Sequence, residues 1–223
     1  EQQQINNLKI YLDENNITQA TNYFGLEAFR AIMAGGDVDY VEKVIYDDSF
    51  LDTDIECIHN QLKNGDTFYK DMIEHFNDSN QQSHLIFEIG NVPAGDWGIT
   101  SGDPDNANEF TITVGPHMED KSNLAKIVTM SHELIHAYMF DFLEDAGLIT
   151  FDLDGAPLLN VDDLQCDDGI NYNGINLNSL TTEEMFYALP GTMEQKGTLG
   201  NNFTHDLFNV PTFEITDYRE ALE

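Results

Sequence analysis

Two histidines and a glutamate stand at a spacing that can bind a metal ion and activate a water molecule. They are His132, Glu133 and His136, in the segment S-H-E-L-I-H-A. Helix residues four positions apart project from one face about one turn apart, so both imidazoles can bind one ion. Glu133 can then reach a water at an open coordination position and take its proton, because zinc lowers the pKa of such a water toward ~7. These residues predict hydrolysis of a peptide bond.

The residues around this H-E-x-x-H motif predict a long, mainly buried helix. Asp120, Ser122 or Asn123 can cap its start, and we expect the helix to span about 122–145. Apolar residues recur along it at helical spacing, namely Leu124, Ile127, Val128, Leu134 and Ile135. Two histidines and a glutamate in a buried helix would need costly polar partners if no metal were bound. We therefore expect Zn2+ on a central helix.

The remaining pattern predicts an α+β fold. From about residue 5 to about 80 the apolar residues recur at intervals of three and four, which indicates helices. The segments L-I-F-E-I at 85–89 and F-T-I-T-V at 110–114 are short and β-rich, and we expect a small antiparallel sheet from them. The second strand could serve as the edge that binds a substrate. We predict a helical subregion over 1–83 and a catalytic region over 84–223, packed as one compact domain.

The chain resembles the zincin metallopeptidases, and within them the SprT-like group. The resemblance covers roughly residues 85–145 and depends on H-E-L-I-H-A at 132–137, on K-S-N-L-A-K-I-V-T-M-S before it, and on the preceding strand. It implies a zincin-like fold and zinc-dependent hydrolysis of peptide bonds, with His132 and His136 as ligands and Glu133 as general base. The longer form H-E-x-x-H-x-x-G-x-x-H is absent, because Met139 and Phe142 occupy its Gly and third His positions.

A third ligand must come from elsewhere in the chain. Eight residues of helix advance about 12 Å, whereas a ligand atom lies ~2 Å from zinc, so we expect Asp141 and the acids after it to form a solvated face. A three-histidine site agrees with the SprT-like resemblance, and for that reason we favour His205. The alternatives are Glu183 or Glu184 on a second helix, and His117. Thr181 and Glu184 also form a capping box, which accounts for Glu184 without a metal.

The net charge of the chain limits which classes of binding partner we expect. The 41 acidic and 9 basic residues give a formal charge of -32, which repels phosphate backbones and excludes nucleic acid as an expected partner. The DNA-linked role of many SprT-like proteins is therefore not expected here. A polypeptide substrate of neutral or basic character fits this charge better. No stretch approaches the ~20 apolar residues of a membrane span, so we expect none.

Three further observations leave alternatives open. Acidic loops at 103–109 and 152–155 could bind Ca2+, although neither matches an EF-hand. Cys57 and Cys166 could form one disulfide in an exported protein, and the start at E-Q-Q-Q agrees with a removed export signal. Besides a zinc hydrolase, the sequence is therefore compatible with a catalytically inactive zincin-like binding domain or with an acidic, calcium-binding exported module.

Overall fold

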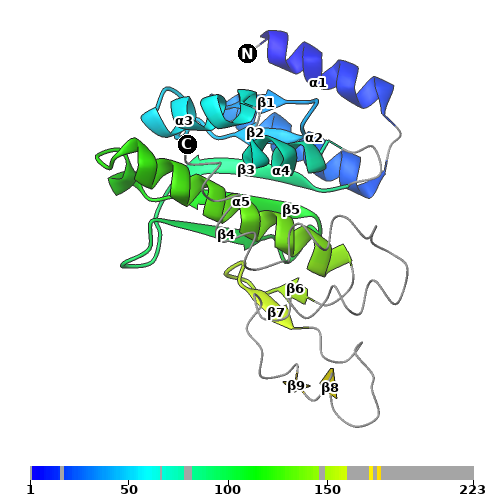
Figure 1. The fold of residues 1–223 in the computed structure, drawn as a ribbon. Coiled ribbons are helices and arrows are strands. Elements are labelled where there is room, and N and C mark those ends of the chain that lie inside the picture. Colours follow the sequence, from blue (N-terminus) through cyan, green and yellow to red (C-terminus); the bar gives the residue numbers. More distant parts are fainter. Residues whose placement is uncertain are drawn as a thin grey trace. The chain divides into compact units, whose positions relative to one another are not determined.

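The fold is α+β, as the sequence predicts. The computed structural model describes residues 2–15, 18–65, 67–77, 82–145, 149–159, 171–172 and 175–176. The chain forms two compact units, one of Glu1–Asp141 with Phe151–Ala156 and one of Phe142–Thr150 with Pro157–Glu223. The first unit contains the main sheet and the helices that cover it (Figure 1).

Four helices in the N-terminal part of the chain confirm the helical pattern. They are α1 (Gln2–Glu14), α2 (Gln19–Ala34), α3 (Asp54–Asn64) and α4 (Phe68–His75). A threonine caps each of the last three: the side chains of Thr18, Thr53 and Thr67 each accept a hydrogen bond from the amide three residues ahead. Such caps satisfy an amide that lacks a partner inside the helix.

A mixed sheet of five strands forms the centre of the first unit. Its strands are β1 (Asp37–Asp39), β2 (Val44–Tyr46), β3 (His84–Ile89), β4 (Gly98–Gly102) and β5 (Glu109–Val114), in the order β1-β2-β3-β5-β4. β2 is parallel to β3 and β3 is parallel to β5, whereas β1 and β4 pair antiparallel with their neighbours.

Two expectations about this sheet are wrong. The hairpin β1–β2 lies inside the segment expected to be helical, because V-I-Y at 44–46 is a fully buried run of strand-forming residues. The strands at 84–89 and 109–114 are parallel rather than antiparallel. The chain between them forms β4, which returns along the outer side of β5, so that β3 and β5 run in the same direction.

Helices cover both faces of the sheet (Figure 1). On one face, Leu8 of α1 and Phe24 of α2 pack in a buried cluster with Ile45 of β2. On the other face, the His59 ring of α3 contacts Phe87 of β3. Side chains alternate between the two faces of a strand, so Phe87 and its neighbour Ile86 on β3 face opposite sides of the sheet.

The helix α5 (Asn123–Asp145) confirms the predicted central helix. Ser122 Oγ accepts a hydrogen bond of 3.3 Å from the amide of Ala125, as expected for a cap. Met130, Leu134 and Ala137 are fully buried along one side of α5. This burial fixes the helix against the sheet and therefore determines which way its histidines point.

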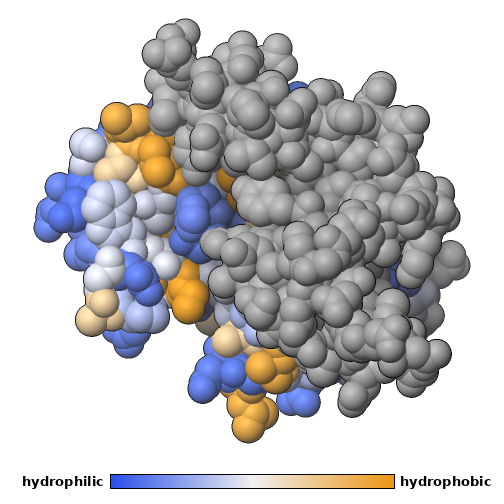
Figure 2. Space-filling view, turned by 60° about the horizontal axis from the view of Figure 1, so that its bottom comes forward, coloured by the Kyte–Doolittle hydropathy of each residue, from blue (hydrophilic) through white to orange (hydrophobic). Residues whose placement is uncertain are grey.

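The remaining described elements are short. They are the 3₁₀ turn Pro116–Met118 and the paired strands β6 (Ile149–Phe151) with β7 (Pro157–Leu159) and β8 (Asn171–Tyr172) with β9 (Ile175–Asn176). None of the helices in the described residues is long and apolar enough to cross a membrane. The coloured part of the face in Figure 2 shows mainly hydrophilic residues with smaller hydrophobic areas between them.

Candidate metal centre

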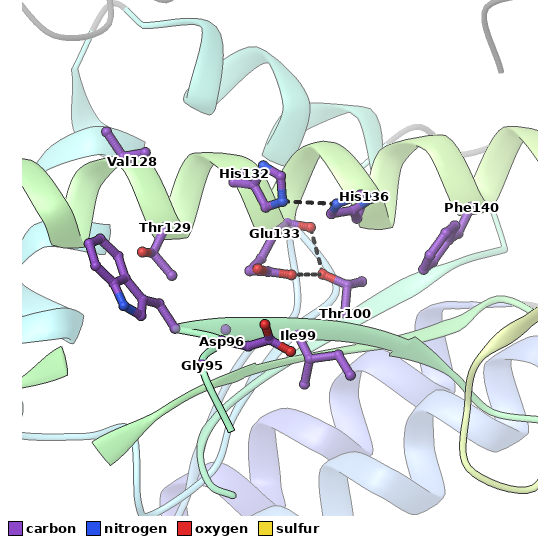
Figure 3. Close-up of a pocket in the computed structure, with 12 residues that line it drawn as sticks. Gly95, Asp96, Ile99, Thr100, Val128, Thr129, His132, Glu133, His136 and Phe140 are labelled. Carbon is purple, nitrogen blue, oxygen red and sulfur yellow. Dashed lines mark hydrogen bonds between the residues drawn. The ribbon is translucent and has the colours of Figure 1, made fainter. Parts of the chain in front are cut away.

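The two motif histidines converge on one point beside α5. His132 Nε2 and His136 Nε2 lie 3.0 Å apart, and the two rings meet edge to face with centroids 4.5 Å apart (Figure 3). His132 is exposed and His136 is partly buried. The spacing of four residues on a helix thus produces the paired imidazoles that the sequence predicts.

The distance between these nitrogens fits a shared zinc ion. Two nitrogen ligands at ~2.05 Å from a tetrahedral zinc are roughly 3.3 Å apart, close to the separation in this structure. Burial, and to a smaller extent the charge of His132, lower the pKa of His136 to about 4. A neutral imidazole offers its lone pair, so His136 is in the state that metal binding requires.

Glu133 points away from the histidines and into the space between α5 and the sheet (Figure 3). Its side chain is buried, and its Oε2 accepts a hydrogen bond of 2.8 Å from the Thr100 hydroxyl. That hydroxyl also lies 2.8 Å from the backbone carbonyl oxygen of Glu133. Burial raises the pKa of Glu133, whereas the Thr100 hydrogen bond and the charge of His132 lower it. A carboxylate with a raised pKa is a stronger base than an ordinary one.

The strand β4 provides the wall that receives Glu133. Gly98 and Thr100 are two residues apart and therefore lie on the same face of β4. A Cβ atom at Gly98 would lie 2.8 Å from Glu133 Cγ, closer than such atoms can approach. Gly98 makes room for the carboxylate, and Thr100 holds it in place.

Sequence reasoning missed Gly98 and Thr100 because it missed β4. The segment G-I-T-S-G has glycine at both ends, and glycine weakens a strand pattern. The signal that remained was the β-branched pair Ile99 and Thr100, which begins two residues after the single tryptophan, Trp97. The expected substrate edge, F-T-I-T-V, is β5, and β5 lies inside the sheet between β3 and β4.

A cavity of about 470 Å³ contains both histidines and Glu133. One wall is the α5 surface from Val128 to Phe140, and the other is the segment from Gly95 to Thr100. The cavity lies directly beside the paired nitrogens and the base candidate. The three motif side chains therefore line one cavity.

Among the described residues, no candidate for the third ligand lies beside the paired histidines. His117 lines a different cavity of about 320 Å³ and is not brought to the paired histidines. His205, Glu183 and Glu184 lie outside the described residues. In the part of the chain that the structure describes, no group of three or more His, Cys, Asp or Glu side chains is placed to hold an ion. The identity of the third ligand stays a prediction.

The acids after the motif do not form a simple solvated face. Asp141 is 1% exposed. Its carboxylate accepts a hydrogen bond from Ser83 Oγ and pairs with His75 Nε2 at 2.7 Å. The expectation that Asp141 would be solvated is wrong, because His75 of α4 and Ser83, the residue before β3, supply it with polar partners. It fixes α5 to these two elements.

The calcium loops are described only in part. In the turn at 103–108, Asp103 Oδ1 accepts hydrogen bonds from the amides of Asp105 and Asn106. These hydrogen bonds stabilise the turn itself. Cys166 lies outside the described residues, and Cys57 is an exposed free cysteine. Neither Ca2+ binding nor the disulfide is tested by these contacts.

Comparison of the chain with protein families, with curated proteins and with solved structures finds no match.

Proposed function

We propose that the protein is a zinc-dependent hydrolase that cleaves peptide bonds, in agreement with its resemblance to zincins. The observation that supports this most is the pair of imidazole nitrogens 3.0 Å apart beside a buried carboxylate. His132 and His136 would hold the ion, and one further ligand, for which we favour His205, would complete the set. When bound, zinc would polarise the substrate carbonyl and lower the pKa of water.

The residues of the chain itself would carry out the proton transfer. Glu133 Oε2 is engaged by Thr100, so Oε1 is the oxygen that would take the proton of the attacking water. The raised pKa of Glu133 suits this role, because the same carboxyl can then donate the proton to the leaving amine. Thr100 would keep the carboxylate from rotating away from the reacting atoms.

The strand β4 would position the substrate. It is the last strand of the five-stranded sheet, so one side of its backbone is not paired within that sheet. An extended peptide can add to such a strand through main-chain hydrogen bonds. Because Gly98 and Thr100 also contact Glu133, a peptide on β4 would pass close to the base.

The test is hydrolysis of an unstructured protein by the zinc-loaded chain and by its Glu133→Gln variant. Glutamine has nearly the same shape but cannot take a proton, so we expect turnover to fall at least ~100-fold while zinc stays bound. Equal hydrolysis by both proteins would show that Glu133 is not the base. Loss of zinc from the variant would show that Glu133 is a ligand.

The second candidate is a metal-binding domain without turnover. It is favoured by the observation that, among the described residues, only His132 and His136 converge as imidazole ligands. Stoichiometric zinc, a stable fold and no cleavage of a broad peptide library would support this candidate over the hydrolase.

A further inference from the structure

The cavity of the metal centre adjoins a second cavity through a shared wall. The two cavities, of about 470 and about 320 Å³, have Gly95, Asp96 and Trp97 in common. Trp97, the only tryptophan in the chain, is 45% exposed. A large aromatic side chain that remains exposed beside a cavity is suited to contact a ligand.

Backbone hydrogen bonds fix this wall. The Asp96 amide donates to the Pro93 carbonyl at 3.1 Å, which closes a turn. The Trp97 carbonyl accepts from the Gly115 amide at 2.9 Å, which connects the wall to the end of β5. Asp96 and Trp97 therefore have fixed backbones, while both side chains remain exposed.

The charged groups that line the two cavities favour a cation. Their carboxylates are Asp96 and Glu133, their histidines are His117, His132 and His136, and the described lining residues include no lysine or arginine. Asp96 is exposed and lines both cavities, whereas Glu133 is buried, so Asp96 is the carboxylate that a cation can reach from solvent.

We propose that Asp96 and Trp97 form a subsite for a cationic group of a bound peptide, an ammonium or a guanidinium. The Asp96 carboxylate would pair with the charge, and the exposed Trp97 indole would contact the same peptide. The subsite deepens the proposed function, since it assigns a substrate preference to that site. The subsite locates the preference for cationic peptides at Asp96 and Trp97, whereas the acidic surface would attract cations everywhere.

Binding can be measured without turnover, because the single tryptophan of the chain reports on the subsite. The full chain with Glu133→Gln is titrated with amidated pentapeptides of alanine whose central residue is arginine, norleucine or glutamate, and Trp97 fluorescence is recorded. The peptides are acetylated, and a norleucine peptide with a free amino terminus distinguishes a terminal ammonium from a side chain. We expect the arginine peptide, or the free amino terminus, to bind about tenfold more tightly than acetylated norleucine.

Two further variants separate the local carboxylate from the net charge. Asp96→Asn and Asp13→Asn each remove one negative charge, but Asp13 is an exposed residue of α1. We expect Asp96→Asn to reduce the preference for the cation about fivefold and Asp13→Asn to leave it unchanged. Equal affinity of the parent for acetylated norleucine, for the arginine peptide and for the free amino terminus, or equal losses in both variants, would overturn the subsite. Hydrolysis is measured separately: a preference without turnover would refute only the proposed function, and turnover without preference only the subsite.

Discussion

The position of Glu133 depends on two small residues of a neighbouring strand. Gly98 has no side chain to collide with the glutamate, and Thr100 offers a hydroxyl at 2.8 Å from its carboxylate. The motif itself therefore places the two histidines, while β4 places the proposed base, Glu133. A zinc hydrolase needs its metal ligands and its base in a fixed relative position, because proton transfer depends on a hydrogen-bonding distance.

Replacement of Thr100 by valine tests this division of roles. Valine has nearly the same shape but no hydroxyl, and the loss of a hydrogen bond to a carboxylate corresponds to about 1.5 kcal/mol, or roughly tenfold in rate. We expect kcat to fall by that factor with little change in KM, and zinc content to stay the same. Steady-state kinetics and elemental analysis measure these quantities.

Thr100→Ser is the matched control, since serine keeps the hydroxyl. We expect it to retain most of the activity that valine loses. If serine and valine variants were equally impaired, the methyl group and not the hydroxyl would be responsible, and the positioning role of the hydroxyl would be wrong.

The motif residues could be predicted because their geometry is local. Four residues of helix determine how His132 and His136 face each other, whatever the rest of the chain does. Thr100 is 33 residues from Glu133, and nothing in its local sequence indicates that contact. The third ligand is harder for the same reason, since every remaining candidate is distant in sequence or lies outside the described residues.

At the scale of elements, amphipathic helices were predictable and strand directions were not. The long helix α5 follows from its apolar spacing and its serine cap. The parallel pairing of β3 with β5 depends on β4, a strand hidden by its two glycines. Short, fully buried runs such as 44–46 also lack the alternation that identifies a half-buried strand.

Buried polar contacts join α3 to the sheet. His59 is completely buried, and its ring nitrogens contact Tyr46 Oη at 3.0 Å and Tyr69 Oη at 2.7 Å. Burial lowers the pKa of His59 to about 3, with a smaller contribution from the positive charge of Lys63. The folded protein thus keeps this histidine neutral in a pH range where the unfolded chain protonates it.

A specific loss of stability on mild acidification follows. As pH falls from ~6.5 toward 3, the unfolded state binds a proton at His59 and the folded state does not. The free energy of unfolding therefore falls by up to ~1.4 kcal/mol per pH unit. The amide of a His59→Gln variant can still bond to both tyrosines but does not titrate. Between pH 7 and pH 5 we expect the free energy of unfolding of this variant to fall by roughly 2 kcal/mol less than that of the parent. Urea unfolding at the two pH values provides the comparison. An unchanged pH dependence in the glutamine variant would contradict a neutral buried His59.

At the scale of the whole molecule, the charge of -32 affects every experiment with cations. Few basic groups are available to offset it, and Lys63 already pairs with both Asp39 and Glu42. Such a surface attracts metal ions and basic peptides without any specific site, an effect that salt screens. Zinc bound at the histidines must therefore be distinguished from zinc held loosely by surface carboxylates.

The most direct test of the central claim is the zinc content of the purified chain after dialysis against high salt with excess magnesium. Magnesium prefers oxygen ligands and competes for the carboxylates, whereas imidazoles retain zinc. We predict about one zinc per chain in the parent and in Glu133→Gln, and almost none in His132→Ala or His136→Ala, since each loses an essential ligand. Near-stoichiometric zinc in either histidine variant, or none in the parent, would contradict a zinc centre on α5.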